Sequence, residues 1–191
     1  MDMQNKEKLF LDSYWNIYKK ILFGGYFDSD LINIKNQILQ TNKLGGKLYF
    51  YGNGASASLS SHAATDFSKQ AKIQALAMND HNLITAFSND YGYSKWVEKS
   101  IEIYVNKDDL IFFISVSGES ENLKNGLIYA KNNGIKTISF TGCKPENFLK
   151  SNSDLNLWVD SNSYNIVESI HTICVTALID LIIGKSSYKV N

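Results

Sequence analysis

The chain has 191 residues, of which 44% are hydrophobic and 20% are charged, and its net charge at pH 7 is zero. This size and composition suit one soluble domain with a sizeable core, and the neutral balance gives no electrostatic reason to expect nucleic acid or an anionic membrane as a partner. All 19 basic residues are lysine, so a bound phosphate has to be held by backbone N–H groups, hydroxyls or lysine and never by a guanidinium.

The first 44 residues predict a pair of helices. Apolar side chains recur at helical spacing over residues 4–22. A second helix is expected over about 28–43, beginning after Asp28 or Ser29 as its cap.

From residue 45 onward, apolar runs that suit strands alternate with helical patterns. The expected strands are 47–54, 73–78, 110–117, 135–142 and 155–159, and the expected helices are 56–69, 82–88, 94–104, 121–134 and 164–183. Nearly continuous apolar strands that alternate with helices indicate a parallel sheet covered on both faces. We therefore predict an α/β fold with a five-stranded, parallel, doubly wound sheet flanked by helices, preceded by the N-terminal helical pair.

No repeat or proline-rich linker divides the sequence, so we expect a single domain over 1–191 with its α/β core at 45–191. Cys143 and Cys174 lack metal-type spacing and are expected to be reduced thiols. The polar residues 1–10 lack the apolar segment of a signal peptide, and no run is expected to be long enough to span a bilayer. A cytoplasmic protein without a membrane partner is the prediction.

A polar loop follows the predicted strand 110–117, at the point where a helix begins. It contains Ser115, Ser117, Gly118 and Ser120. A helix N-terminus offers unpaired N–H groups, serine adds hydroxyl donors, and glycine lets the backbone approach a ligand. The loop therefore suits an anion, although an ordinary serine cap is the simpler alternative. It is not a P-loop, because no GKS or GKT follows it.

A second strand end repeats this pattern. At the end of the strand 47–54 the sequence reads Gly52, Asn53, Gly54, Ala55 and Ser56, where the next helix begins. Carboxyl ends of parallel strands lie at one edge of the sheet, where ligands of doubly wound folds bind. Two such loops would converge on one crevice, which strengthens the interpretation as an anion site.

Five motifs in this order and spacing resemble the sugar isomerase (SIS) domain family, most closely its phosphoheptose isomerases. They are GNGASAS, LITAFSNDYGY, ISVSGESENL, GIKTISFTG and VESIHTICVTALIDLI. The resemblance implies a sugar phosphate as ligand, no nucleotide cofactor, and a homo-oligomer, usually a tetramer, in which residues 1–44 pack between subunits. The substrate-binding and phosphate-binding residues that it implies are Asn53, Ser56, Asp90, Ser115, Ser117, Gly118, Ser120 and Asn122.

Interconversion of a ketose phosphate and an aldose phosphate moves a proton between C1 and C2, which requires a base at carbon and an acid or base at oxygen. Phosphoheptose isomerases resemble one another in using a glutamate on the helix after the GNG loop and a histidine on the last helix. Many also carry a zinc site built from a histidine, that glutamate, a glutamine and that last histidine.

This sequence departs from that pattern. His62 matches the first histidine, but Asp66 replaces the glutamate, Glu168 replaces the glutamine, and Thr176 replaces the last histidine. The resemblance therefore implies Asp66, Glu168 and His171, which matches a second family histidine, as catalytic candidates. His62, Asp66 and Glu168 would be the candidate Zn²⁺ ligands.

Three functions remain open at this stage. The first is an isomerase that converts sedoheptulose 7-phosphate to a D-glycero-D-manno-heptose 7-phosphate-type product for lipopolysaccharide or capsule synthesis. The second is an isomerase for another phosphosugar. The third is a non-catalytic SIS protein that binds a sugar phosphate or a protein partner. Metal-free acid–base chemistry and plain packing roles for both histidines also remain open.

Overall fold

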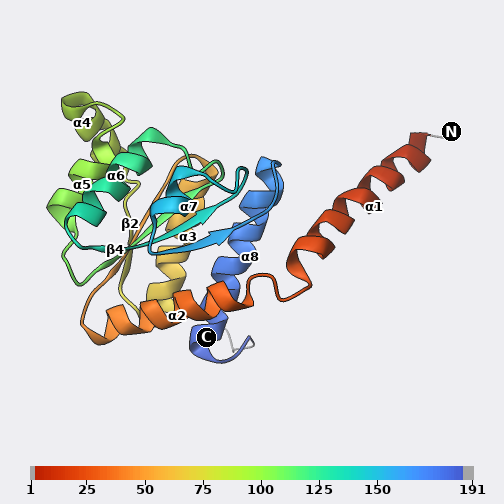
Figure 1. Cartoon of the computed structure of the whole chain (residues 1–191), viewed down its shortest axis with the longest axis horizontal. Helices are drawn as coiled ribbons and strands as arrows, with labels where there is room; N and C mark the ends of the chain where they lie inside the picture. The colour runs from red at the N-terminus through yellow and green to blue at the C-terminus, as the bar shows by residue number, and fades with distance from the viewer. Residues whose placement is uncertain (1–2, 187–191) are drawn as a thin grey trace.

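A five-stranded sheet forms the centre of the structure, a computed structural model in which residues 3–186 are described. Helices cover both of its faces, as Figure 1 shows. The elements in chain order are α1 (Met3–Leu22), α2 (Asp28–Lys43), β1 (Leu48–Gly52), α3 (Ala55–Lys69), β2 (Ala75–Ala77), α4 (His81–Tyr91), α5 (Trp96–Tyr104), β3 (Leu110–Ser115), α6 (Glu121–Asn132), β4 (Lys136–Thr141), α7 (Phe148–Asn152), β5 (Leu155–Trp158) and α8 (Tyr164–Ile183).

The strand order is β2-β1-β3-β4-β5, and every neighbouring pair is parallel. The chain runs from β1 outward to β2 and then crosses back, so that β3 lies on the other side of β1. Gly52 is in register with Ile114, so the loops after β1 and β3 leave the sheet at one edge. This is the switch point of a doubly wound sheet, where such folds bind their ligands. The predicted fold class is confirmed.

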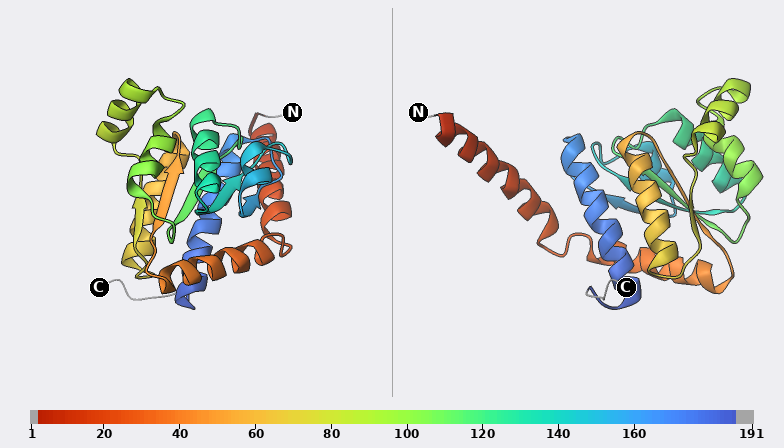
Figure 2. Two further views of the ribbon diagram at one scale, coloured as in Figure 1. Left: turned by 60° about the vertical axis from the view of Figure 1, so that its left-hand side comes forward. Right: turned by 180° about the vertical axis from the view of Figure 1, so that it is seen from behind.

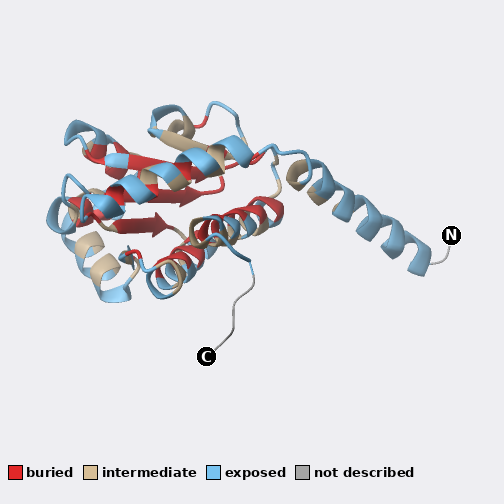
Figure 3. Cartoon of the chain, turned by 90° about the horizontal axis from the view of Figure 1, so that it is seen from below, coloured by how far each residue is buried: buried red, intermediate tan, exposed pale blue. Residues whose placement is uncertain are grey.

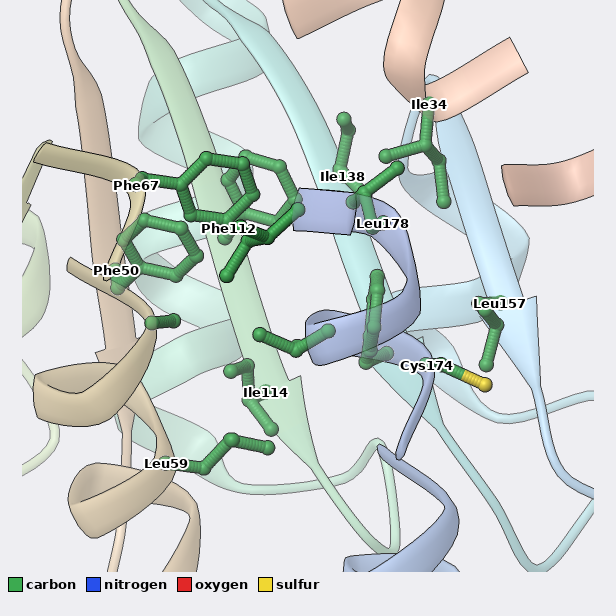
Figure 4. Packing of buried hydrophobic residues seen from close by; sticks show 14 of the residues in the cluster. Ile34, Phe50, Leu59, Phe67, Phe112, Ile114, Ile138, Leu157, Cys174 and Leu178 are labelled. Atoms are coloured by element: carbon green, nitrogen blue, oxygen red, sulfur yellow. The ribbon is translucent and has the colours of Figure 1, made fainter. Parts of the chain in front are cut away.

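Two hydrophobic clusters explain why the strands read as continuous apolar runs. On one face, the rings of Phe50 and Phe112 stack at 4.6 Å under α2, α3 and α8, as Figure 4 shows. On the other face, Phe113 packs in a cluster with Trp96 of α5 and with residues of α6. Alternate side chains of each central strand thus enter opposite clusters, so both faces require apolar residues. Figure 3 shows the buried sheet between exposed outer helix faces.

The short helix α7 was not predicted from the sequence. It has five residues, too few for a helical period to be visible. It begins where Asn147 Oδ1 accepts a hydrogen bond from the Lys150 N–H at 3.0 Å. The predicted cap of α2 was wrong, because Phe27 precedes the helix without a side-chain cap bond. A turn in which the Asp28 N–H donates to the Gly25 carbonyl leads into this helix instead.

Helix α8 corrects one expectation. By length and composition it is the one helix within residues 3–186 that would suffice to cross a membrane, with a mean hydropathy of 1.9. The prediction that no apolar run is long enough was therefore wrong by these measures. Val167, Ile170 and Leu178 of α8 are fully buried in the core against the sheet. Core packing accounts for an apolar helix of this kind.

Helix α1 projects away from the rest of the chain in Figure 1 and in the right-hand view of Figure 2. All of its residues, Met3–Leu22, are described, and none of them is buried. Tyr18 and Ile21, near its end, pack partly against the core. Large apolar side chains of this helix and of the residue after it are exposed: Leu9, Phe10, Leu11, Trp15, Ile17 and Phe23.

Candidate active site

Two adjoining cavities lie beyond the carboxyl ends of β1 and β3. The first, the serine cavity, has a volume of about 110 Å³. Its lining comprises Asn53, Ser56, Ile114, Ser115, Val116, Ser117, Ser120, Tyr164 and Glu168. The second, the histidine cavity, has a volume of about 300 Å³ and lies between α3 and α8, which run side by side in Figure 2. Its lining comprises Ala55, Ser56, Ser58, Leu59, His62, Glu168, Ser169, His171 and Thr172. Ser56 and Glu168 line both cavities, so the two adjoin at these residues.

The loop after β3 is folded by its own serines. The Gly118 N–H donates to Ser115 Oγ at 3.1 Å, and the Glu119 N–H donates to Ser117 Oγ at 3.2 Å. Ser120 Oγ lies 3.5 Å from Ser115 Oγ, at the edge of hydrogen-bond distance. Helix α6 starts directly after Ser120, and its first N–H groups have no acceptor within the helix. Ser115, Ser117 and Ser120 all line the serine cavity, so their hydroxyls are the donors that this loop can offer an anion.

Gly118 is required by the conformation of this loop. Its φ is +67°, and a Cβ at this position would collide with the side-chain amide of Asn147. Asn147 is itself buried and donates to the Gly142 and Lys144 carbonyls at 3.2 and 2.8 Å. Asn147, directly before α7, thus packs against Gly118 and supports the serine loop. Asn147 was not singled out in the sequence, because it is separated from the loop by almost thirty residues.

The loop after β1 is attached to α6. The Nδ2 of Asn53 donates to Asn122 Oδ1, and the Nδ2 of Asn122 donates to Asn53 Oδ1, each at 3.0 Å. Tyr93 adds a hydroxyl that donates to Asn53 Oδ1 at 3.0 Å. Tyr93 lies in the SNDYGY segment but was not predicted as a site residue. Asn122 is buried and its amide is paired with that of Asn53. It therefore acts on the site by positioning Asn53.

The described lining of the serine cavity contains no positively charged side chain. Among the described residues that line it, no lysine is present, and Glu168 is the one carboxylate. The sequence contains no arginine. Within one chain, an anion in this cavity would be held by neutral donors alone, beside a carboxylate. Neutral backbone and hydroxyl donors hold phosphate in many helix N-terminal sites.

His62 and Asp66 form a pair one helical turn apart on α3. Their Nε2 and Oδ2 atoms are 3.0 Å apart. The side chain of His62 is 52% exposed, whereas that of Asp66 is 18% exposed. His62 lines the histidine cavity, and Asp66 is not among the described residues that line either cavity. Within this chain, Asp66 therefore reaches the cavity through His62.

His171 has a different environment. It is fully buried, and its Nε2 lies 3.2 Å from the Thr141 carbonyl at the end of β4. Burial lowers the pKa of this imidazole to about 4, against a smaller opposing effect of the Thr141 carbonyl. His171 is thus neutral near pH 7. Its Nδ1 is buried and has no hydrogen-bond partner among the described residues.

Thr176 occupies the position of the family's last histidine but does not supply its acid–base group. Its hydroxyl donates to the Ile173 carbonyl at 2.9 Å and to the Thr172 carbonyl at 3.2 Å, both in its own helix. It is not among the described residues that line the two cavities. Asp90 also lies outside their described lining; it is exposed on α4 and accepts a hydrogen bond from Asn89.

The residues present do not form the zinc site that the resemblance implies. His62 and Glu168 line the same cavity, but within residues 3–186 no group of three His, Cys, Asp or Glu side chains is placed to hold a metal ion. Asp66 is bound to His62, and threonine is not a usual ligand of Zn²⁺.

Comparison with known proteins identifies the family. The profile of the SIS domain matches residues 28–142. A phosphoheptose isomerase of Helicobacter pylori is 31% identical over 158 residues, which cover 80% of this chain and 82% of that protein. One from Clostridium acetobutylicum is 32% identical over 171 residues, which cover 86% of each chain. The structure of a phosphoheptose isomerase from Francisella tularensis, 25% identical, superposes with a TM-score of 0.86 and covers 97% of this chain and 100% of that one.

Proposed function

The chain belongs to the phosphoheptose isomerase family of SIS domain proteins, and on this premise we propose that it is an aldose–ketose isomerase acting on sedoheptulose 7-phosphate. The observation that carries the proposal is the position of Glu168, which lines both cavities. In this substrate the phosphate and the carbonyl are at opposite ends of a seven-carbon chain. A pair of adjoining cavities suits such a ligand, with phosphate in the serine cavity and the carbonyl end in the histidine cavity.

Glu168 is the proposed base at carbon. Glu168 lies at the junction of the two cavities. A sugar chain whose carbonyl end enters the histidine cavity must therefore pass this carboxylate. It would take the proton from the carbon beside the carbonyl and return it to the neighbouring carbon through an enediol.

Proton transfer to and from the substrate oxygens requires a second acid–base group. His62 faces the same cavity, and Asp66 holds its ring by the 3.0 Å contact. A carboxylate that binds one imidazole nitrogen fixes the tautomer and orientation of the ring. We propose that Asp66 acts in this way, as a positioning residue for His62. The pair would compensate for the imidazole that the last helix lacks at Thr176.

The proposed product is a D-glycero-D-manno-heptose 7-phosphate-type aldose, which would supply heptose for surface polysaccharide. Substrates of this kind are intracellular metabolites, which agrees with a cytoplasmic enzyme. The phosphate-binding residues of the proposal are Asn53, Ser56, Ser115, Ser117, Gly118 and Ser120. Asp90 is proposed as a residue close to the substrate on the basis of the resemblance alone.

A proton NMR time course in D₂O tests the proposal. With sedoheptulose 7-phosphate we expect a new aldose anomeric signal and deuterium next to the carbonyl. Glu168→Gln should lower the rate roughly 100-fold or more, since general base catalysis contributes factors of this size, while sugar phosphate binding is retained. The same time course with added Zn²⁺ tests for metal dependence. Full turnover in Glu168→Gln would exclude this residue as the base.

A second candidate is a non-catalytic protein that binds a sugar phosphate. The observation that favours it is Thr176, whose hydroxyl is bound within its own helix and supplies no acid–base group. The two candidates differ in one measurement. A binding protein would be stabilised thermally by the sugar phosphate and would show no isotope exchange in D₂O.

We also infer a homo-oligomer, with a tetramer as the expected state. The exposed apolar side chains of α1, including Phe10 and Trp15 at 64% and 54% exposure, lie on a helix that has no buried residue of its own. A projecting helix of this composition needs a partner surface to be stable in water. A second copy of the chain supplies a matching apolar helix.

A further inference from the structure

The ring of His171 is held in one position by two contacts. Its Nε2 lies 3.2 Å from the Thr141 carbonyl, and the ring packs edge-on against Phe140 with centroids 5.7 Å apart. A carbonyl oxygen can only accept, so Nε2 carries the hydrogen and donates it. The other ring nitrogen, Nδ1, is then unprotonated and can only accept a hydrogen bond.

This acceptor is unpaired. His171 is 0% exposed, and its Nδ1 has no partner among the described residues. An unpaired buried polar atom is rare, and it points to a ligand or a bound water. His171 also belongs to the lining of the histidine cavity, together with His62 and Glu168. The histidine cavity is therefore the space beside the His171 ring from which a ligand would approach.

We propose that Nδ1 of His171 accepts a hydrogen bond from a hydroxyl of the sugar chain and thereby selects polyhydroxylated phosphate esters. This inference rests on the proposed function, because it assumes that a sugar phosphate extends from the serine cavity into the histidine cavity. His171 would be a specificity-determining residue that touches the substrate. The catalytic role that the sequence analysis gave to His171 would then belong to Glu168 and His62.

The chemistry of the ring favours a hydroxyl donor. Burial keeps the imidazole neutral, with a pKa of about 4, so its acceptor is present at every pH at which the sugar phosphate is a dianion. A base at carbon would have to become an imidazolium in this buried place, which burial opposes. Accepting a neutral hydroxyl creates no charge and satisfies the unpaired nitrogen.

Two substitutions separate the two nitrogens of His171. Gln carries an amide nitrogen near the position of Nε2, so His171→Gln keeps a donor for the Thr141 carbonyl and loses the acceptor at Nδ1. Asn carries an amide oxygen near the position of Nδ1, so His171→Asn keeps the acceptor and loses the donor. The dissociation constants of sedoheptulose 7-phosphate and of inorganic phosphate, which is too small to reach the histidine cavity from the serine cavity, are measured for each protein.

We expect His171→Gln to weaken the sugar phosphate roughly tenfold, the loss of about one hydrogen bond, and to leave inorganic phosphate unchanged. His171→Asn should keep most of the sugar affinity and melt at a lower temperature. Unchanged sugar affinity in His171→Gln would overturn the proposal. So would an equal loss in both variants, because the loss would then not depend on whether the acceptor at Nδ1 is kept.

A measurement on the unmodified protein keeps the proposal testable if both variants fail to fold. In protein labelled with ¹⁵N-histidine, the Nδ1 resonance of His171 should shift on saturation with sedoheptulose 7-phosphate and stay in place with inorganic phosphate. No shift with the sugar phosphate would overturn the inference. Turnover does not enter these readouts. Sugar binding with a shifted resonance but no isomerisation would refute the proposed reaction and leave the role of His171 intact.

Discussion

Asn53 and Asn122 join the loop after β1 to the start of α6 through two hydrogen bonds, with each side-chain amide donating to the other at 3.0 Å. The two residues lie on either side of the switch point of the sheet. Their pairing fixes the distance between the glycine-rich loop after β1 and the serine loop after β3. The shape of the serine cavity thus depends on a contact between residues 69 positions apart.

Replacing Asn122 by Leu should weaken phosphate binding although Asn122 is not in the lining of the serine cavity. The Nδ2 of Asn53 would lose its acceptor, while Tyr93 would still donate to Oδ1. An unpaired polar group of this kind costs about 1–3 kcal/mol. We expect a lower melting temperature and a roughly tenfold weaker affinity for inorganic phosphate by calorimetry. Asn132→Leu, on the exposed side of the same helix, is the matched control and should change neither quantity. Equal phosphate affinity in Asn122→Leu and the original protein would contradict the role of this pair.

Gly118 and Gly134 provide a comparison in which backbone strain is the same and the surroundings differ. Their φ angles are +67° and +69°, but a Cβ at Gly118 would collide with Asn147, whereas one at Gly134 would meet nothing within 4 Å. Either alanine should cost about 1–2 kcal/mol of stability because of the left-handed backbone. Gly118→Ala should in addition abolish phosphate binding. If both variants bound phosphate normally, the serine loop would not be the anion site.

The stability of the fold should fall on acidification because of His171. Its pKa is about 4 in the folded chain and about 6.5 in the unfolded one, so the unfolded chain binds more protons between these values. Stability from this group is complete above about pH 6.5 and is lost as the pH falls toward 4, by up to about 1.4 kcal/mol per pH unit.

Urea unfolding between pH 4 and 7 measures this slope. His171→Gln should remove the contribution of His171, and His81→Gln should retain it, because His81 is 85% exposed. An unchanged slope in His171→Gln would mean that other groups produce the acid sensitivity.

The apolar side of α1 should hold the subunits together. Trp15→Asp combined with Phe10→Asp places charges on two exposed aromatic positions, and we expect smaller particles by analytical ultracentrifugation. Substituting Glu7 and Asp12, which are exposed on the same helix, with Asn is the control and should leave the assembly intact. A monomeric original protein, or an unchanged assembly in the double aspartate variant, would show that α1 does not join subunits.

The local sequence determined most of the elements. Helix α8 was predicted over 164–183, as observed, because its apolar residues continue over five turns. The central strands were located but drawn too long: β1 ends at Gly52, not at residue 54, because Gly54 has a positive φ and leads directly into α3. Helix α7 has five residues, which is too short for a helical repeat of apolar residues to be visible in the sequence.

The serine loop and the glycine-rich loop were also visible in the sequence, because strand ends of a parallel sheet meet at one edge. What the sequence by itself determined is therefore the fold class, the family and the two loops, since each depends on short-range patterns of burial and turn chemistry. The tertiary structure decided how the side chains combine. It placed Glu168 at the junction of two cavities and buried His171 with one nitrogen unpaired. These relationships depend on how α3 packs beside α8, and the contacts between side chains of different helices are not set by the periodicity of either one.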